Sequence, residues 1–568
     1  MSRRTRVRRF AGSVFAALSL ATALAAASSP VADAAMRGDR EAVQQLLRKG
    51  GDVNAAQGDG MTALHWAALK GDGPLTEMLM YAGANIRATT RLGGYTPLHL
   101  AARAHQREVA AALIAAGAHV NAPTTNGATA LMFAAAAGDE RVVTTLIENG
   151  ADVNATDAPQ KLTPLMYAAA YGRTEAVRTL LKRGARPQVT SRVVDVSELL
   201  TPEEENAQRQ RQLGRPVTGA AGAAAGLPQN RTAGVDRPYR YSELIGTQGG
   251  FSALQFAARE GYLDTAKALV EGGADVNQEN PGNSATPLLT AIINGNFDLA
   301  MYLVVAGARV DHAASNGVTP LYATLNVQWH NKSPHPQPTE YEQQRTSYLA
   351  MMRALLDKGA DANARLKAKV WYSAFNSDFS GVDEAGATPF WRAAYASDVE
   401  AMRILVQHGA DPNIPTIRPA GRPTAGDQPR SVADVSGLPP VPVGGPGVPP
   451  LLAAAGVGYG EGFAANSHRY ALTGFLPAIK YLVDELGVDV NAIDHEGNTA
   501  LHMAASRGDT ESVLFLVSRG ADVTRVNREG NTTADMANGP VQRTQPYPET
   551  LALLMKLGAK NNHRCVTC

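Results

Sequence analysis

The chain has 568 residues, too many for one ordinary hydrophobic core, so it contains either several domains or one small unit repeated many times. Its 53 Lys and Arg residues nearly balance its 52 Asp and Glu residues, and this balance argues against a nucleic-acid-binding protein. Aromatic residues make up only 6% of the chain, whereas Ala, Leu and Val are abundant, which favours small, closely packed helices.

The first 27 residues have the three-part composition of a secretory signal peptide. Five Arg residues in the first nine positions precede an apolar run from Ala11 to Ala27, which ends in small residues suited to signal peptidase. The run is too short and too rich in Ala for a comfortable membrane span, so an uncleaved anchor is the less favoured alternative. We expect an exported protein, periplasmic or secreted, without a membrane span after removal of residues 1–27. The Arg pairs leave both the general and the twin-arginine export routes open.

A block that begins Thr-(Pro/Ala)-Leu recurs along the rest of the chain. It occurs at intervals of 33 or 34 residues at Thr62, Thr96, Thr129 and Thr163, and at Ser252, Thr286 and Thr319. It appears again, at wider intervals, at Thr388, Pro449 and Thr499, and then at Thr532. A second string, Gly-Ala-Asp-Val-Asn-Ala at 150–155, recurs with small changes near the end of each unit. One Gly near each unit end gives a count of twelve units.

Each part of the unit has a physical reason. Thr96 can cap a helix by accepting from free backbone N–H groups, and Pro97 then stands at the first helical position, where its missing donor costs nothing. A second helix follows in which apolar residues at i, i+3 and i+4 form one stripe, for example Val177, Leu180 and Leu181. Gly150 can end such a helix in a left-handed conformation.

The strings Thr96–Ala102 (TPLHLAA) and Gly150–Ala155 (GADVNA) resemble the ankyrin repeat. This resemblance implies an all-α repeat solenoid of about twelve stacked units, each with two antiparallel helices and a β-turn finger. The family's histidine position is filled by His65, His99 and His502, whereas other units hold different residues there. We expect local hydrogen bonding to differ in those units.

The repeats are interrupted by polar or Pro/Gly-rich insertions that bury too little to fold alone. We expect a first stack at 29–187, a polar flexible insertion at 188–248, further repeats at 249–413 with insertions at 326–344 and 365–386, a Pro/Gly-rich insertion at 414–448, C-terminal repeats at 449–563 and a Cys-containing tail at 564–568. The insertions are either solvated loops or lids and docking segments.

No known catalytic motif is present, so the sequence predicts neither an enzyme nor a cofactor. His330 and His335 lie five residues apart, but a metal site would need further ligands, so no metal site is expected. Large apolar residues recur at one position of successive units, namely Trp66, Leu100, Phe133, Tyr167 and Phe256. They could form a ligand-facing ladder, although a role in the core is favoured.

The resemblance implies that protein partners bind beside the finger Gly and just beyond the double Ala of the first helix. In this sequence those positions are Asp59, Met61, Leu69, Lys70, Leu92, Tyr95, Arg103, Asn126, Tyr171, Phe251, Arg259, Tyr395, Ser506 and Arg507. The sequence therefore predicts a protein–protein interaction scaffold outside the cytoplasm, which binds partners through the concave face of the repeats. The sequence does not define the partner or the oligomeric state.

The chain ends in Cys-Val-Thr-Cys, formed by Cys565 and Cys568. The attachment motif of c-type haem is Cys-x-x-Cys-His, and no His follows here. A terminal disulfide or an inert tail is the favoured interpretation. The alternative is a redox or haem-linked protein, truncated before that His, with the repeats as its docking module.

Overall fold

The computed structural model describes residues 29–196, 246–330, 339–368, 382–419, 434–458, 469–539 and 546–563, with a few single positions between them. The chain divides into two compact units. Unit 1 contains the chain up to Arg192 together with Lys267–Ala274, and unit 2 contains Val193–Ala266 together with the chain from Asp275 onward. The signal peptide expected at residues 1–27 and the tail at 564–568 lie outside the described residues.

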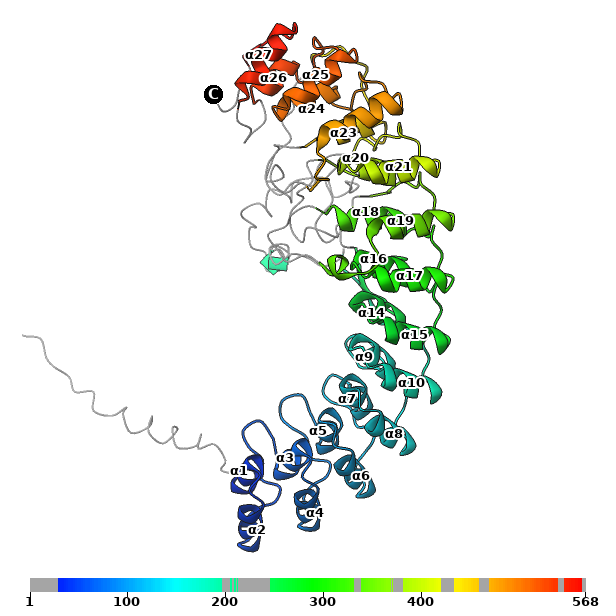
Figure 1. Cartoon of the computed structure of the whole chain (residues 1–568). Helices are drawn as coiled ribbons and strands as arrows, with labels where there is room; N and C mark the ends of the chain where they lie inside the picture. Colours follow the sequence, from blue (N-terminus) through cyan, green and yellow to red (C-terminus); the bar gives the residue numbers. More distant parts are fainter. Residues whose placement is uncertain are drawn as a thin grey trace, which may run out of the picture. The chain divides into compact units, whose positions relative to one another are not determined.

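Unit 1 is a row of five helix hairpins that follow one another in chain order (Figure 1). Its helices are α1 (Pro30–Arg37), α2 (Arg40–Arg48), α3 (Ala63–Lys70), α4 (Gly73–Tyr81), α5 (Pro97–Arg103), α6 (Arg107–Ala115), α7 (Ala130–Ala137), α8 (Glu140–Glu148), α9 (Pro164–Ala170) and α10 (Thr174–Lys182). Each odd-numbered helix packs against the next odd-numbered helix, and from α4 onward each even-numbered helix packs against the next even-numbered one. The first helices therefore form one layer and the second helices another.

Unit 2 continues the same pattern. The helices begin with α14 (Ala253–Glu260), α15 (Leu263–Glu271), which is shared between the units, α16 (Pro287–Ile293), α17 (Phe297–Val305), α18 (Pro320–Gln328), α19 (Tyr348–Asp357), α20 (Pro389–Tyr395) and α21 (Val399–Gln407). They end with α22 (Pro450–Ala454), α23 (Phe475–Lys480), the π-helical turn η3 (Tyr481–Glu485), α24 (Ala500–Ser506), α25 (Thr510–Ser518), α26 (Thr533–Ala537) and α27 (Pro548–Lys556). Over the described residues the two units hold twelve hairpins, so the predicted all-α stack is confirmed.

Two insertions differ in detail from their expected bounds. The expected insertion at 326–344 begins too early, because α18 continues to Gln328 and a 3-10 helix, η1 (Glu340–Gln343), lies in its second part. The insertion at 188–248 begins and ends in a two-stranded antiparallel pair, β1 (Val193–Asp195) with β2 (Thr247–Gly249). The sequence analysis did not expect these strands. Their pairing brings the two ends of the insertion together within unit 2.

The apolar stripes of the second helices are buried as the spacing predicts. Val177 and Leu180 on α10 are completely buried, and so are Val513 and Leu516 on α25. The last residue of the stripe on α10, Leu181, is half-buried. Burial of an aliphatic side chain contributes about 1.5–3 kcal/mol, and neighbouring hairpins supply the apolar surface that one hairpin lacks.

The first helices begin with the expected cap. The backbone N–H of His99 donates to Oγ1 of Thr96 at 3.4 Å, and the backbone N–H of Thr96 donates to Nδ1 of His99 at 3.0 Å. Nε2 of the same imidazole donates to the carbonyl of Ala122 at 3.0 Å. The histidine thus links its own helix start to the loop that leads to the next hairpin.

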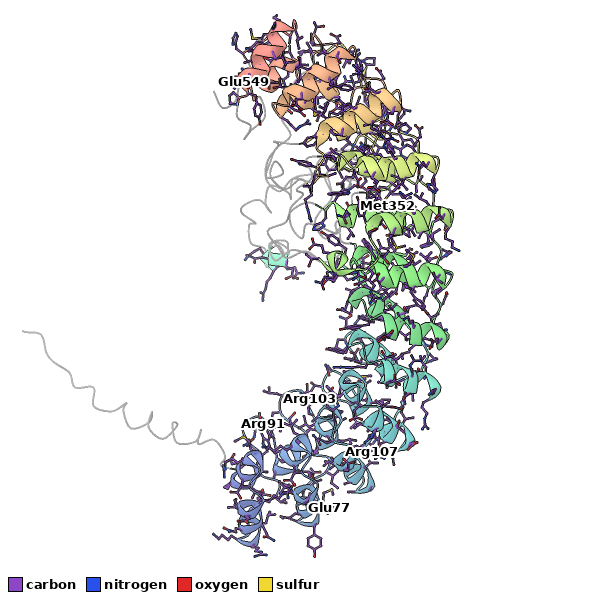
Figure 2. All side chains as sticks on the ribbon, in the orientation of Figure 1. Glu77, Arg91, Arg103, Arg107, Met352 and Glu549 are labelled. Carbon is purple, nitrogen blue, oxygen red and sulfur yellow. The ribbon has the colours of Figure 1, made fainter. Side chains whose placement is uncertain are left out.

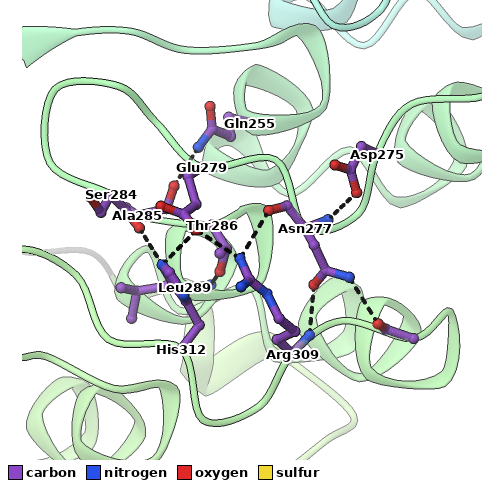
Figure 3. A network of polar contacts seen from close by, with 11 residues as sticks. Gln255, Asp275, Asn277, Glu279, Ser284, Ala285, Thr286, Leu289, Arg309 and His312 are labelled. Carbon is purple, nitrogen blue, oxygen red and sulfur yellow. Dashed lines mark hydrogen bonds and ion pairs between the residues drawn. The ribbon is translucent and has the colours of Figure 1, made fainter.

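The Asn of the recurring Gly-Ala-Asp-Val-Asn string links neighbouring repeats. Asn277 donates through its side-chain amide to the carbonyl of Gly307 at 3.2 Å and accepts from the backbone N–H of Arg309 at 2.7 Å (Figure 3). The same pair of bonds recurs at Asn54, Asn121, Asn154, Asn363 and Asn491. This string is therefore a connector between repeats as well as a turn.

Candidate functional site

Four of the predicted partner-binding residues are packing residues, which corrects the expectation for them. Tyr395 is 2% exposed and stacks on Trp391 at 5.1 Å between ring centroids, and Met61 and Ser506 are also buried. The side chain of Arg507 is 3% exposed, lies 3.9 Å from the centroid of the Phe475 ring and pairs with Asp509 at 2.7 Å. Local packing in these units encloses positions that the resemblance alone places at a surface.

Two predicted residues of unit 2 lie together. Arg259 is exposed, and its guanidinium lies 5.6 Å from the ring centroid of Phe251, which is half-buried, and 5.2 Å from that of Phe256. The same side chain donates to Glu260 at 2.7 Å. The positive charge of Arg259 is thus already paired within the unit.

Apart from Met61, the predicted residues of unit 1 remain accessible. Leu92 is 74% exposed and Tyr171 is 55% exposed. Tyr95 and Leu69 are half-buried, and the other exposed residues are Asp59, Lys70, Arg103 and Asn126. Figure 2 shows Arg91 and Arg103 on the side of unit 1 that α3 and α5 form, and Glu77 and Arg107 on the side of α4 and α6. We call the surface formed by the first helices and their fingers in unit 1 the inner face.

Aromatic side chains gather on the inner face. The ring of Tyr95 meets that of Phe133, on the next first helix, edge-on at 5.6 Å between centroids, and Phe133 lies 5.7 Å from the imidazole of His99. The guanidinium of Arg103 lies 5.9 Å from the ring centroid of Tyr95. Since aromatic pairs prefer such edge-to-face arrangements, the rings hold one another in place on the inner face before any partner binds.

The ladder that the sequence analysis weighed is partly core and partly surface. Leu100 and Phe256 are buried, as the core interpretation predicts, whereas Trp66, Phe133 and Tyr167 are only half-buried. The polar ends of the two larger rings are held, because Trp66 donates to Gln57 at 2.7 Å and the Tyr167 hydroxyl donates to Asp157 at 2.9 Å. Burial, reinforced by the bond to Asp157, raises the pKa of Tyr167, so its hydroxyl stays protonated.

Three exposed cations form a row along the inner face. Arg37, Lys70 and Arg103 stand in the last turns of α1, α3 and α5, and all three are exposed. Arg37 and Lys70 occupy the same position of their hairpins, whereas Arg103 lies one residue earlier, at the position that Leu69 holds in α3. None of the three makes a hydrogen bond or an ion pair with a described residue. The sequence analysis included Lys70 and Arg103 but not Arg37. The recurrence of a basic residue in the last turn of three successive first helices could have identified Arg37.

The family's histidines are structural in this protein. His65, His99 and His502 are buried, and burial lowers the pKa of each imidazole, to about 4 for His99 and His502. Each of them remains neutral near pH 7 and makes the helix cap described above. They are therefore unavailable for acid–base chemistry at neutral pH.

The sequence analysis also considered the His330 and His335 pair and the two C-terminal cysteines. His330 is buried and donates through Nδ1 to the carbonyl of Val327 at 2.7 Å, while His335 lies outside the described residues. Within the described ranges, no three His, Cys, Asp or Glu side chains gather as metal ligands. Cys565 and Cys568 lie beyond residue 563, so their redox or haem-linked role stays a prediction.

Family comparison identifies the repeats. A model of ankyrin repeats in three copies matches residues 31–124, 117–191 and 254–326, a model of ankyrin repeats in many copies matches 467–517, and a single-repeat model matches 385–417. Together these segments cover more than half of the chain. The chain belongs to the ankyrin-repeat family. The resemblance stated from the sequence is confirmed at this level, and the hairpins described above are ankyrin repeats.

Short stretches of the chain are similar to curated ankyrin-repeat proteins. Alpha-latrotoxin-Lh1a of Latrodectus hasselti is 40% identical over 79 residues, which are 13% of this chain and 6% of the toxin. Ankyrin repeat and SAM domain-containing protein 6 of Rattus norvegicus is 37% identical over 70 residues, 12% of this chain and 8% of that protein. Protein phosphatase 1 regulatory subunit 27 of Mus musculus is 39% identical over 71 residues, 12% of this chain and 46% of that protein. The match thus spans less than half the length of each relative.

Across the described residues, none of the helices has both the length and the apolar character that a bilayer span requires.

Proposed function

We propose that this ankyrin-repeat protein is a binding scaffold outside the cytoplasm that recognises a protein partner through the inner face of unit 1. The observation that carries the proposal is the set of exposed cations Arg37, Lys70 and Arg103, which form no ion pair with a described residue. Arg103 lies over the half-buried ring of Tyr95, which in turn meets the ring of Phe133. Arg and Tyr are typical anchors of binding surfaces, because they combine apolar area with donors. Ankyrin repeats in general support protein binding, and one relative is named as a regulatory subunit.

The charge of the inner face defines the partner's chemistry. Of the ionisable residues on the first helices of unit 1, only Asp33 is acidic, and its carboxylate accepts from the side chain of Gln57 at 2.6 Å. The finger carboxylates of Asp59 and Asp157 also accept within the unit, from the backbone N–H of Met61 at 2.9 Å and from the Tyr167 hydroxyl at 2.9 Å. The three cations therefore keep their charge available for a partner. We propose that the partner presents carboxylates spaced along an extended segment, next to apolar side chains that cover the Tyr95 and Phe133 rings.

Affinity capture tests this proposal. The mature protein is compared with a triple variant, Tyr95→Ala, Arg103→Ala and Tyr171→Ala, with captured proteins quantified by mass spectrometry. The matched control is Arg48→Ala with Tyr81→Ala, because both side chains are exposed on second helices and Tyr81 is 97% exposed. We expect proteins captured by the wild type and the control to be lost with the triple variant. Equal recovery with all three would rule out the inner face.

Two further parts of the proposal are that the protein acts by binding alone and that it is exported. Export is supported by the basic and apolar composition of residues 1–27. Mass spectrometry of the N-terminal peptide of the mature protein tests it. We expect the mature chain to begin close to residue 28, and a mature protein that retains Met1 would contradict export by cleavage.

A further inference from the structure

A buried arginine in unit 2 forms no ion pair with a carboxylate of the described residues. Arg392 stands on α20 at the position that holds Leu100 and Phe133 in unit 1, and it is only 2% exposed. Its Nε donates to the side-chain oxygen of Asn326 at 2.9 Å and its Nη2 donates to the carbonyl of Trp329 at 2.6 Å. Its Nη1 is buried and has no hydrogen-bond partner. Neither acceptor carries a charge, so this guanidinium is held in place without being neutralised.

Further basic groups lie next to Arg392. The residue that follows Trp329 is His330, whose imidazole meets the ring of Tyr341 edge-on at 6.1 Å. The Tyr341 hydroxyl accepts from Nη1 of Arg469 at 3.1 Å, and Arg469 has no carboxylate partner within the described ranges. Burial, with the nearby charges of Arg469 and Arg392, lowers the pKa of His330. We call Arg392, His330, Tyr341 and Arg469 the basic cluster.

The carboxylates near this cluster do not pair with Arg392. The charge of Glu342 acts on His330, and that of the buried Glu384 acts on Tyr322, but neither forms an ion pair with Arg392. Asp398 is held by other donors. Oδ2 of Asp398 accepts from Nε1 of Trp329 at 2.8 Å and from the hydroxyl of Tyr348 at 2.8 Å. Its Oδ1 accepts from the backbone N–H of Ala401 at 3.0 Å, as the cap of α21 (Figure 1). Both carboxylate oxygens therefore hold the helix start and two aromatic side chains, and neither pairs with Arg392.

Packing alone does not account for a buried arginine at this position. A buried charge is costly unless a counter-charge and hydrogen bonds compensate it, and an apolar residue at this position would pack without that cost, as Leu100 does. A water molecule could accept from Nη1 but would leave the charge in place. An oxyanion would accept from Nη1 and would also neutralise the charge, because its oxygens accept from the donors of a guanidinium.

We propose that the basic cluster binds the oxyanion of a small ligand, a carboxylate or a phosphate group, which accepts from the free Nη1 of Arg392 and is neutralised jointly by Arg392 and Arg469. This site lies within unit 2 and uses no residue of the inner face of unit 1. Its success or failure is therefore separate from that of the proposed protein-binding function.

Calorimetric titration of the full chain with inorganic phosphate, and separately with acetate, tests the proposal at constant pH and ionic strength. Sodium chloride at equal ionic strength is the reference. Arg392→Met and Arg469→Met remove one guanidinium each and keep an apolar stem. The control is Arg353→Met, because Arg353 is exposed on the second helix α19.

We expect saturable binding of phosphate or acetate, but not of chloride, by the wild type and the control. Arg392→Met should abolish this binding, and Arg469→Met should weaken it at least tenfold. If Arg392→Met does not fold, Arg469→Met and the charge-retaining Arg392→Lys decide, since both should weaken binding while the control does not. Phosphate binding alone assigns a phosphate ligand, and acetate binding alone assigns a carboxylate. Absence of saturable binding for both anions, or equal binding by Arg469→Met and the wild type, would overturn the proposal.

Discussion

Protonation of the buried His99 at low pH should destabilise unit 1. Another repeat of the same chain holds a residue that cannot titrate at the equivalent position. In α14 the equivalent position holds Gln255, which accepts from the backbone N–H of Ser252 at 3.0 Å. Its side-chain amide donates to the carbonyl of Ala285 at 2.7 Å (Figure 3). These bonds match those that His99 makes with Thr96 and Ala122. The substitution His99→Gln should therefore keep the cap and remove only the titrating group.

The size of the effect follows from the pKa of His99. Burial lowers this pKa from 6.5 to about 4 in the folded protein, so protonation favours the unfolded chain. The stabilisation is fully present above pH 6.5 and is lost as the pH falls towards 4. Linkage gives a loss of about 2 kcal/mol at pH 5 and about 3 kcal/mol at pH 4 for the wild type. The Gln variant loses none of this.

Urea unfolding followed by circular dichroism, at pH steps between 7.5 and 4, measures the difference between the two proteins. We expect His99→Gln to be equal to or slightly less stable than the wild type at pH 7.5, and more stable at pH 4.5. Other histidines and carboxylates titrate in both proteins, so they cancel in the difference. If the two stabilities change in parallel across this range, the buried neutral state of His99 is refuted.

Three further outcomes are expected. Leu516→Ala should lower the free energy of unfolding by about 2–5 kcal/mol, because Leu516 is completely buried on α25. Leu514→Ala on the same helix should lower it far less, because Leu514 is 49% exposed, and urea unfolding midpoints compare the two variants. Asn154→Ala should cost about 1–2 kcal/mol through two lost bonds to the next repeat, and Asn149→Ala, which loses one bond within its own helix, should cost less by the same assay. Capture of the partner by unit 1 should fall as sodium chloride is raised from 50 to 500 mM, and capture that is insensitive to salt would contradict a cationic binding surface.

Much of the fold could be predicted from the sequence, because the same capping, apolar and Gly positions recur in each repeat. The Thr cap, the Val177 and Leu180 stripe and the Gly at each unit end all agree with one hairpin, and the hairpins have these elements where the pattern places them. The bounds at 326–344 were wrong because Asn326 is polar but buried, as an acceptor for Arg392. Sequence pattern alone shows polarity and not the partner that permits burial.

The candidate site was predictable only in part. Position within the repeat located Tyr95, Arg103 and Tyr171 correctly on an accessible surface. It also selected Tyr395, which is buried because Trp391 stacks on it. The position of the buried Arg392 was assigned to no function, because its significance depends on the burial of its Nη1 without a hydrogen-bond partner. That property belongs to the packed structure and has no signature in the sequence.

Site-specific photo-crosslinking in the producing cell tests the central claim most directly. A photoreactive phenylalanine analogue replaces Tyr171 or Leu92 on the inner face, and Tyr81 or Val305 on second helices as the comparison, all four being exposed positions. The account predicts a discrete protein adduct from positions 171 and 92 and none from positions 81 and 305. Adducts that form only from positions 81 or 305 would contradict the inner face of unit 1 as the binding surface.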